Sequence, residues 1–441
     1  MPTGSAIAQA AALDPGPSAS AVPTPAVPAP AAPTLGLYFS VPFCRSKCTY
    51  CNFASGVYPA SQHDRYVERL VSDLRAARAR AARLGLHLPE LVDSVYFGGG
   101  TPVLLSPQNF QAIFAALRSE FALASDAEIT IECAPAQLPD ATLAALVDCG
   151  ANRFSLGVQS FLDRECAVSG RLHRRPDVLA DIARLRESGI HNLNLDLLAG
   201  LAGQTLASWR ESLNVLLETA VPHASIYMLE IDEDSRLGRE LLDGGARYHA
   251  DLVPGDDAIA TMYETAIETL AAAGLAQYEI SNFARPGHAS RHNLRYWSRQ
   301  PYLGFGLNAA SMLFAAAQNH SHPADDVDPP AALRFTTTAD LAHYLAPDVP
   351  ANQHPPLSEQ AWLSTARQIE ETWFLGLRRT SGVSVAALEQ RFSAAVIESS
   401  LRVARHLVER GLLACESGER FTLTPRGRLI SNEVFAEFLA D

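Results

Sequence analysis

The chain has 441 residues and a hydrophobic fraction of 48%, enough for one large α/β domain and a smaller one. Its net charge of −13 disfavours nucleic acid and acidic lipid as broad electrostatic partners, and no apolar run reaches the roughly 18 residues of a transmembrane segment. Seven cysteines are too few for a disulfide framework. Three of them fall within eight positions, which indicates metal binding in a reducing, cytoplasmic setting.

Residues 1–34 differ in composition from the rest of the chain. They contain eleven Ala and eight Pro, with Asp14 as the only charged side chain. The prolines interrupt the continuous apolar core that a signal peptide needs. This segment is therefore predicted to be a disordered Ala/Pro-rich tail, and nothing in it indicates export.

From Leu35 onward, short β-rich runs alternate with longer amphipathic stretches. Strands are predicted at 36–41, 94–97, 128–132, 153–157, 192–197, 225–229 and 276–280, and helices at 64–84, 107–121, 205–217 and 257–273. This alternation predicts a parallel sheet with helices packed outside it, and six or seven such units favour an open or closed barrel. In such a fold the ligand site gathers at the carboxyl ends of the strands.

A cysteine motif with the spacing C-x3-C-x2-C, formed by Cys44, Cys48 and Cys51, follows the first predicted strand. Thiolates are soft ligands that suit iron–sulfur clusters, and three of them leave one iron of a 4Fe–4S cubane open. A zinc site usually needs four ligands, and the chain has no second C-x2-C pair. Tyr50 is a candidate for packing on a bound nucleoside. Lys47, the only lysine of the chain, is interpreted as a solvated loop charge.

The second predicted strand ends in three glycines, Gly98, Gly99 and Gly100, followed by Thr101. Glycines let the backbone approach a ligand closely, so that its amides and carbonyls can hold a polar group. Together with the cysteine motif, this run indicates a site for the methionine end of S-adenosylmethionine (SAM). A plain tight turn is the structural alternative.

Polar side chains close three further predicted strands, where an apolar core would not select them. Glu132, Gln159 and Asp196 occupy these strand ends, and Arg171 follows in a short loop. An unpaired buried acid is costly, so each acid is expected to face a ligand or a cation. The planar guanidinium of Arg171 suits a carboxylate. Each residue alone is equally well explained as a structural polar group, but together they favour a ligand site. The sequence does not identify a catalytic residue.

The remaining chain divides into three parts. Residues 35–311 are interpreted as the barrel with an extension at its mouth, and 312–358, rich in Ala, Pro, His and Asp, as a linker. Residues 359–441 predict a smaller C-terminal helical, winged-helix-like domain with a short hairpin. From position 361 onward, ten Arg balance ten acidic residues, and such a neutral module is a poor phosphate binder. Nucleic acid is therefore not expected as a partner.

The run from Tyr38 to about Ser311 resembles the radical-SAM family of oxygen-independent coproporphyrinogen III oxidase and its relatives, the HemW heme chaperones. Segments 371–378 and 421–429 match this family too. The resemblance implies a partial (β/α)6 radical-SAM barrel with a C-terminal helical domain, and SAM chelating the open iron of a 4Fe–4S cluster. It also implies that these residues surround SAM: Tyr38, the Gly98–Thr101 loop, Glu132, Gln159, Arg171 and Asp196.

Two features favour the chaperone branch. The oxidase carries a fourth cysteine two positions after the third, and here that position is Phe53. The run His292-Asn-Leu-Arg-Tyr-Trp297 resembles the chaperones and joins an imidazole to two aromatic rings, a plausible surface for heme. A packed loop capping the barrel mouth is the alternative interpretation of this run.

The leading hypothesis is a heme chaperone that binds heme, a 4Fe–4S cluster and SAM and passes heme to an acceptor protein. Such a protein is expected to cleave SAM reductively, but its main role is heme delivery rather than coproporphyrinogen oxidation. An electron donor is a further expected partner. The heme acceptor is expected to be a respiratory protein, and transient membrane association is compatible with this role. The alternative is coproporphyrinogen oxidation by a SAM-derived radical. Four departures from the family pattern, at Ser40, Ala134, Ala202 and Gly304–Ala310, leave the cluster ligands untouched, although Ser40 and Ala134 lie beside the predicted pocket.

Overall fold

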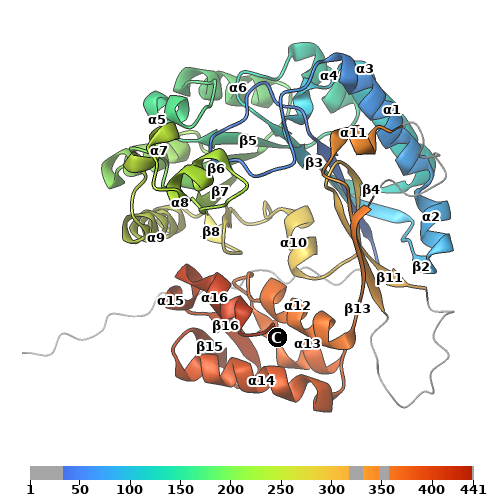
Figure 1. The fold of residues 1–441 in the computed structure, drawn as a ribbon, viewed down its shortest axis with the longest axis vertical. Helices are drawn as coiled ribbons and strands as arrows, with labels where there is room; N and C mark the ends of the chain where they lie inside the picture. Colours follow the sequence, from blue (N-terminus) through green and yellow to red (C-terminus); the bar gives the residue numbers. More distant parts are fainter. Residues whose placement is uncertain (1–32, 317–330, 347–356, 440–441) are drawn as a thin grey trace, which may run out of the picture.

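The computed structural model describes residues 33–316, 331–346 and 357–439. The tail predicted for residues 1–34 lies almost wholly outside these described residues. Within them, no helix combines the length and the apolar character that crossing a membrane requires. The described chain forms an α/β barrel-like unit and a smaller C-terminal unit below it in Figure 1.

The barrel is built on six parallel strands that occur in chain order across one sheet. They are β1 (Leu35–Val41), β3 (Leu91–Gly99), β4 (Ala122–Cys133), β5 (Arg153–Gln159), β6 (Asn192–Ala199) and β7 (His223–Met228). Their apolar side chains, such as Phe39, Phe97 and Leu195, are fully buried against the helices. The full sheet runs from β13 to β8 without closing on itself, which confirms a partial (β/α)6 barrel.

Helices cover the convex side of the sheet, as Figure 1 shows. They are α1 (Ser61–Arg75), α2 (Ala77–Arg83), α3 (Pro107–Glu120), α4 (Asp140–Asp148), α5 (Asp163–Val168), α6 (Arg175–Glu187), α7 (Leu206–Glu218), α8 (Arg236–Leu242) and α9 (Asp256–Ala272). Side-chain caps start two of the helices predicted from sequence: Ser106 accepts from the Asn109 N–H, and Thr205 from the Ser208 N–H. The predicted helix at 64–84 is divided into α1 and α2. Short elements between them are β2 (Leu86–His87) and two 3₁₀ turns (Pro102–Leu104 and Arg247–Leu252).

The sheet continues past the six parallel strands at both edges. Beyond β7 lie β9 (Asn282–Ala284) and β8 (Ala276–Gln277), so the strand predicted at 276–280 is shorter and antiparallel. Beyond β1 lie β10 (Tyr302–Gly306), β11 (Ala310–Ala315), β12 (Ala332–Thr337) and β13 (Leu357–Leu363), with α10 (Arg291–Trp297) and α11 (Leu341–Tyr344) beside them.

The segment expected to be a linker, 312–358, therefore holds sheet strands in its described part. Strand β12 pairs with β11 on one side and β13 on the other. Leu333 and Phe335 are buried in the barrel core. The composition of the segment as a whole hid this short apolar run, because its strands are separated by Pro-, His- and Asp-rich stretches.

The C-terminal unit has a hydrophobic core of its own around Trp373, Phe392 and Leu407. It comprises α12 (Thr365–Gly376), β14 (Val383–Ser384), α13 (Val385–Glu389), α14 (Ala394–Glu409), β15 (Leu413–Glu416), β16 (Arg420–Leu423), α15 (Pro425–Leu429) and α16 (Ser431–Ala436). Its three strands pair in the order β14-β16-β15, which with the helices gives the winged-helix-like shape predicted from sequence. Because β13 belongs to the barrel sheet, this unit begins at α12 rather than at residue 359.

Candidate functional site

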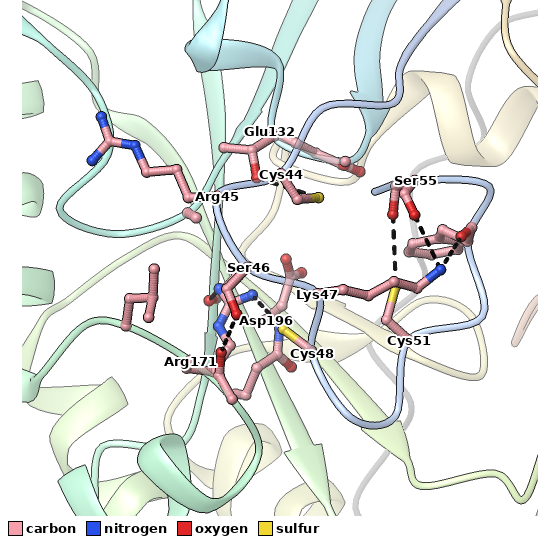
Figure 2. A pocket seen from close by; sticks show the side chains of 18 of the residues that line it. Cys44, Arg45, Ser46, Lys47, Cys48, Cys51, Ser55, Glu132, Arg171 and Asp196 are labelled. Carbon is pink, nitrogen blue, oxygen red and sulfur yellow. Dashed lines mark hydrogen bonds between the residues drawn. The ribbon is translucent and has the colours of Figure 1, made fainter. Parts of the chain in front are cut away.

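A cavity of about 300 Å³ opens at the carboxyl ends of the parallel strands, between the strand ends and the loop that follows β1. Figure 2 shows this pocket, with the cysteine loop passing in front of Glu132, Asp196 and Arg171. Most of the residues predicted to form the site line it: Cys44, Cys48, Tyr50, Cys51, Gly99, Gly100, Thr101, Glu132, Gln159, Arg171 and Asp196. Tyr38, Gly98 and His292 do not line it. The structure thus gathers eleven of the fourteen predicted residues around one cavity.

Backbone hydrogen bonds hold the two ends of the cysteine loop together. The Cys44 N–H donates to the Gly56 carbonyl at 2.9 Å, and the Gly56 N–H donates to the Pro42 carbonyl at 2.9 Å. Farther along, the Thr49 N–H donates to the Ser169 carbonyl at 3.1 Å, and the Thr49 carbonyl accepts from Leu237 at 2.9 Å. The loop is therefore fixed to the sheet and to two neighbouring segments at the same edge.

The three cysteines of the motif fit an iron–sulfur cluster by their chemistry and position. All three are free thiols, half-buried, and line the same cavity. Thr101 Oγ1 lies 3.9 Å from the Cys44 sulfur, and Arg171 donates to the Cys48 sulfur at 3.6 Å, so polar donors already face the thiols. Among the described residues no three His, Cys, Asp or Glu side chains are gathered as for a single metal ion. A 4Fe–4S cubane is bound at three separate corners, so its three ligands lie farther apart than the ligands of one metal ion. Soft sulfur donors suit such a cluster.

Lys47 has a structural role that the sequence did not reveal. Its Nζ donates to the carbonyls of Phe53 and Ser55, at 3.0 and 3.1 Å, and so closes the turn that carries Cys51. Figure 2 shows this amine beside Ser55. Arg236 from α8 donates to the Lys47 carbonyl on the other side. The Lys47 amine is partly exposed, as a loop charge would be, and in addition it bonds to the backbone of the cysteine loop.

The three glycines after β3 perform different tasks. A Cβ on Gly98 would lie 3.0 Å from the carboxylate of Glu132, and Gly99 has a φ of +101°, which other residues rarely adopt. Gly100 packs on the cysteine loop: its N–H donates to the Val41 carbonyl at 2.8 Å. The run thus positions the loop and one acid in addition to lining the cavity.

Two half-buried acids face the cavity, Glu132 from β4 and Asp196 from β6. Glu132 accepts from Tyr96 Oη at 2.8 Å and from the Gly99 N–H at 3.2 Å. Asp196 accepts from Asn194 Nδ2 at 2.7 Å and from Ser155 Oγ at 3.2 Å. Burial raises the pKa of both carboxyls, that of Glu132 to about 7, although these hydrogen bonds oppose the shift. Neither acid has a cationic partner at salt-bridge distance among the described residues, so a cationic ligand would complete the site.

The raised pKa of Glu132 predicts a pH-dependent stability of the cluster-free protein. The native state keeps the proton of Glu132 to a higher pH than the unfolded state does, because the unfolded carboxyl has an ordinary pKa near 4.5. Stability should therefore fall as pH rises from about 4.5 to about 7, by ~2 kcal/mol for this group. Urea unfolding at pH 5 and pH 8 measures the difference, and Glu132→Gln should remove that part of it. An unchanged pH dependence in the variant would contradict this assignment.

The loop and strand end opposite the acids present cationic and amide groups. Gln159 ends β5 in a left-handed conformation with φ of 69°, at a register shift between β5 and β6. Such a conformation is strained for a non-glycine residue and is typical of functional sites. Arg171 donates to the Gly157 carbonyl, and a Cβ on Gly157 would lie 2.9 Å from the Arg171 guanidinium. Gly157 thus provides the space that Arg171 occupies.

Some pocket residues were not predicted from sequence. Ser155 and Gly157 lie four and two residues before Gln159 on β5. Because alternate residues of a strand point to the same face, both could have been predicted to line the cavity with Gln159. Tyr227 lies on β7, where no motif draws attention to it, and its ring lines the cavity. Ala134, one of the departures from the family pattern, also lines the cavity. Ser40, another departure, does not line it, and its carbonyl accepts from Tyr66 Oη at 2.5 Å.

Tyr38 and His292 lie inside the barrel, away from the pocket. The Tyr38 ring stacks on Tyr96 at 6.0 Å, and His292 lies 5.2 Å from the same ring. His292 is 1% exposed, and its ring nitrogens contact Ser94 Oγ at 3.1 Å and Tyr296 Oη at 2.8 Å. Its helix, α10, docks at the amino ends of the strands, where the His292 N–H donates to Glu128. The sequence predicted that His292 lies at the barrel mouth. The structure places it at the opposite end of the strands, so this prediction is wrong.

Family models match two parts of this chain. Residues 38–216 match the radical SAM superfamily. Residues 363–430 match the HemN C-terminal domain. The first match covers the cysteine loop and every strand end with a predicted SAM contact, and the second covers most of the C-terminal unit.

The chain is similar over nearly its whole length to proteins named heme chaperone HemW. That of Bacillus subtilis is 33% identical over 405 residues, 92% of this chain and 99% of the relative. That of Lactococcus lactis is 31% identical over 404 residues, 92% and 97% of the two chains. Among solved structures, coproporphyrinogen III oxidase (HemN) from Escherichia coli, described as a radical SAM enzyme, aligns with a TM-score of 0.75. It shares 21% identity and covers 92% of this chain and 90% of its own.

Proposed function

Because the chain belongs to the HemW family of the radical SAM superfamily, we propose that it is a heme chaperone, which binds heme and transfers it to an acceptor protein. The relatives that share most of its length carry that name, and the match includes both the barrel and the C-terminal unit. The observation that carries the proposal is this full-length similarity combined with a cysteine loop of three thiols.

We also propose that Cys44, Cys48 and Cys51 hold a 4Fe–4S cluster and that SAM occupies the cavity behind them. A reduced cluster of this kind supplies the electron for reductive cleavage of bound SAM. In this proposal the guanidinium of Arg171 holds the SAM carboxylate, and Glu132 and Asp196 bind its cationic and hydroxyl groups. Supporting this arrangement, the two acids lack a cation of their own and face the cavity that the thiols line.

Phe53 supports the chaperone over the oxidase. It stands where the oxidase carries a fourth cysteine, and its side chain is 61% exposed at the pocket. A phenyl ring at this place cannot act as the additional thiol. Coproporphyrinogen oxidation remains the alternative outcome of the experiment below.

The proposed function requires two protein partners, a heme acceptor and an electron donor for the cluster. We place the protein in the cytoplasm, because the seven cysteines form no disulfide among the described residues and three of them are arranged for a metal cluster. From the family resemblance, we propose that the heme acceptor is a respiratory protein.

Heme uptake by the reconstituted protein tests the proposed function. The cluster-loaded chain should bind about one heme, followed as a shift of the Soret band during titration, with and without SAM and dithionite. Heme preloaded on the protein should then move to an apo-hemoprotein acceptor. Absence of heme binding, together with SAM cleavage stimulated by coproporphyrinogen, would instead assign the chain to the oxidase branch.

A further inference from the structure

A row of hydrogen-bonded side chains runs from the pocket into the interior of the barrel. It begins at Asp196 on the cavity wall and continues through Asn194 and His223 to Tyr278. Asn194 and Asp196 share one face of β6, because the leucines that alternate with them, such as Leu195, are buried in the core on the other face. Asn194 is also the register partner of His223 on β7. We name these four polar residues the lumen network.

The contacts within the lumen network are short. Asn194 Nδ2 donates to Asp196 Oδ1 at 2.7 Å and to Ser155 Oγ at 2.8 Å. Asn194 Oδ1 lies 2.6 Å from His223 Nδ1, and Tyr278 Oη lies 2.9 Å from His223 Nε2. Asn194, His223 and Tyr278 are at most 7% exposed. Because buried polar groups need partners, each member of the network depends on its neighbours.

The chemistry of the partners fixes the direction of these hydrogen bonds. A carboxylate only accepts, so the amide nitrogen of Asn194 faces Asp196 and the amide oxygen faces His223. His223 Nδ1 must then carry the hydrogen, which leaves Nε2 to accept from the Tyr278 hydroxyl. Burial lowers the pKa of His223 well below its usual range, so the ring is neutral and can hold this tautomer. Every donor of the network therefore points along the row toward Asp196.

Neighbouring groups hold the lumen network at its far end and at its middle. Tyr278 Oη accepts from the N–H of Ser290, the N-cap residue of α10, at 3.1 Å. Ser225 Oγ lies 3.0 Å from Asn194 Nδ2 and donates to Asn282 Oδ1 at 2.8 Å. The Asn194 amide is therefore held on both sides, and it cannot turn without leaving buried groups unpaired.

Asp196 keeps acceptor capacity for a ligand after these contacts are made. Asn194 occupies one position on Oδ1, and Ser155 Oγ donates to Oδ2 at 3.2 Å. An ionised carboxylate offers roughly four such positions, so each oxygen has one left. Because Asp196 lines the cavity, these positions are available to a ligand there. Two free acceptor positions on a fixed carboxylate suit the neighbouring hydroxyls of a ribose.

We propose that His223 is a positioning residue for SAM, which acts through Asn194 to hold the Asp196 carboxylate in the orientation that accepts the ribose hydroxyls. This inference rests on the proposed SAM site and adds to it a residue that does not touch the ligand. His223 is fully buried and does not line the cavity, so its effect on SAM passes through the carboxylate that it orients.

SAM, 2′-deoxy-SAM and 3′-deoxy-SAM are titrated by calorimetry into the cluster-loaded full chain, which measures binding without turnover. The wild type should bind at least one deoxy analogue about tenfold more weakly than SAM, because a hydrogen bond to the carboxylate is lost. In His223→Leu, SAM should weaken by about tenfold, and the discrimination against that analogue should shrink. His223→Asn, whose amide keeps a donor near the place of Nδ1, should restore most of the affinity. Tyr278→Phe should weaken SAM by about threefold, because the tautomer is no longer fixed.

His288→Leu is the matched control. His288 is a partly buried histidine that faces Asn192, two residues before Asn194 on the same strand, with Nδ1 at 3.5 Å from the amide oxygen. The variant should bind SAM and both analogues like the wild type. Iron content and circular dichroism verify that each variant is folded and carries its cluster.

Asp196→Ala separates failure of this inference from failure of the SAM site. If Asp196→Ala weakens SAM but His223→Leu and Tyr278→Phe keep wild-type affinity and discrimination, the positioning role is overturned while the SAM site stands. An equal loss for SAM and both analogues in His223→Leu, or a wild type that does not discriminate among them, also overturns it. If Asp196→Ala leaves SAM binding unchanged, or the wild type binds no SAM, the proposed SAM site fails as well.

Discussion

Cys48→Ala should reduce the iron content of the anaerobically reconstituted protein from about four atoms per chain to almost none. Cys48 lies in the middle of the motif, and its sulfur already accepts from Arg171 at 3.6 Å. With two thiolates the loop cannot hold a cubane by three corners. Colorimetric iron analysis and the visible absorption of the cluster measure the loss, and SAM affinity should fall with it.

A cysteine outside the loop provides the control for that result. Cys415 is a half-buried free thiol on β15 of the C-terminal unit. Cys415→Ala should retain the full iron content. A cluster that survives Cys48→Ala, or is lost in Cys415→Ala, would show that the motif has been assigned wrongly.

Gly100→Ala should have the second-largest effect, although it removes no ligand. The added Cβ would lie 2.7 Å from the Phe43 carbonyl oxygen, 2.9 Å from that of Val41 and 3.0 Å from the Cys44 sulfur. Two of these atoms belong to the backbone and cannot move aside as a side chain end would. We expect the cysteine loop to shift, most of the cluster to be lost, and stability to fall by ~1–3 kcal/mol. Iron analysis and urea unfolding provide the two measurements.

Gly255→Ala is the matched control for this substitution. Gly255 precedes α9, its φ is −69°, and a Cβ there would meet nothing within 4 Å. It should leave both the cluster and the stability near wild type. Should Gly100→Ala load its cluster normally, the tight contact between glycine run and cysteine loop would be unnecessary for function.

The barrel could be predicted from sequence because its signals are local. Each parallel strand is a short apolar run followed by an amphipathic helix, and the order of units along the chain is also their order in the sheet. The added strands β12 and β13 could not be found in this way. Strand β12 pairs antiparallel with β11, and β13 pairs antiparallel with β12, so both depend on long-range pairing that composition alone does not reveal.

The pocket was largely predictable for a related reason. Parallel strands bring their carboxyl ends to one edge, so polar residues such as Glu132 and Asp196 at strand ends must meet there. The docking of α10 follows no such rule. His292 is placed by Ser94 and Glu128, which are register partners on β3 and β4, and no pattern in the helix itself identifies those partners. Sequence therefore identified the aromatic motif but not the end of the barrel that it occupies.

Every cation of this chain is an arginine except Lys47, whose amine closes the cysteine loop. An amine-selective label thus has a single side chain to modify, and it is the one that ties Cys51 in place. Labelling kinetics at that position report on the loop alone, without interference from the rest of the molecule. Order in the cofactor-binding loop can in this way be followed by mass spectrometry in the intact protein, with no engineered probe.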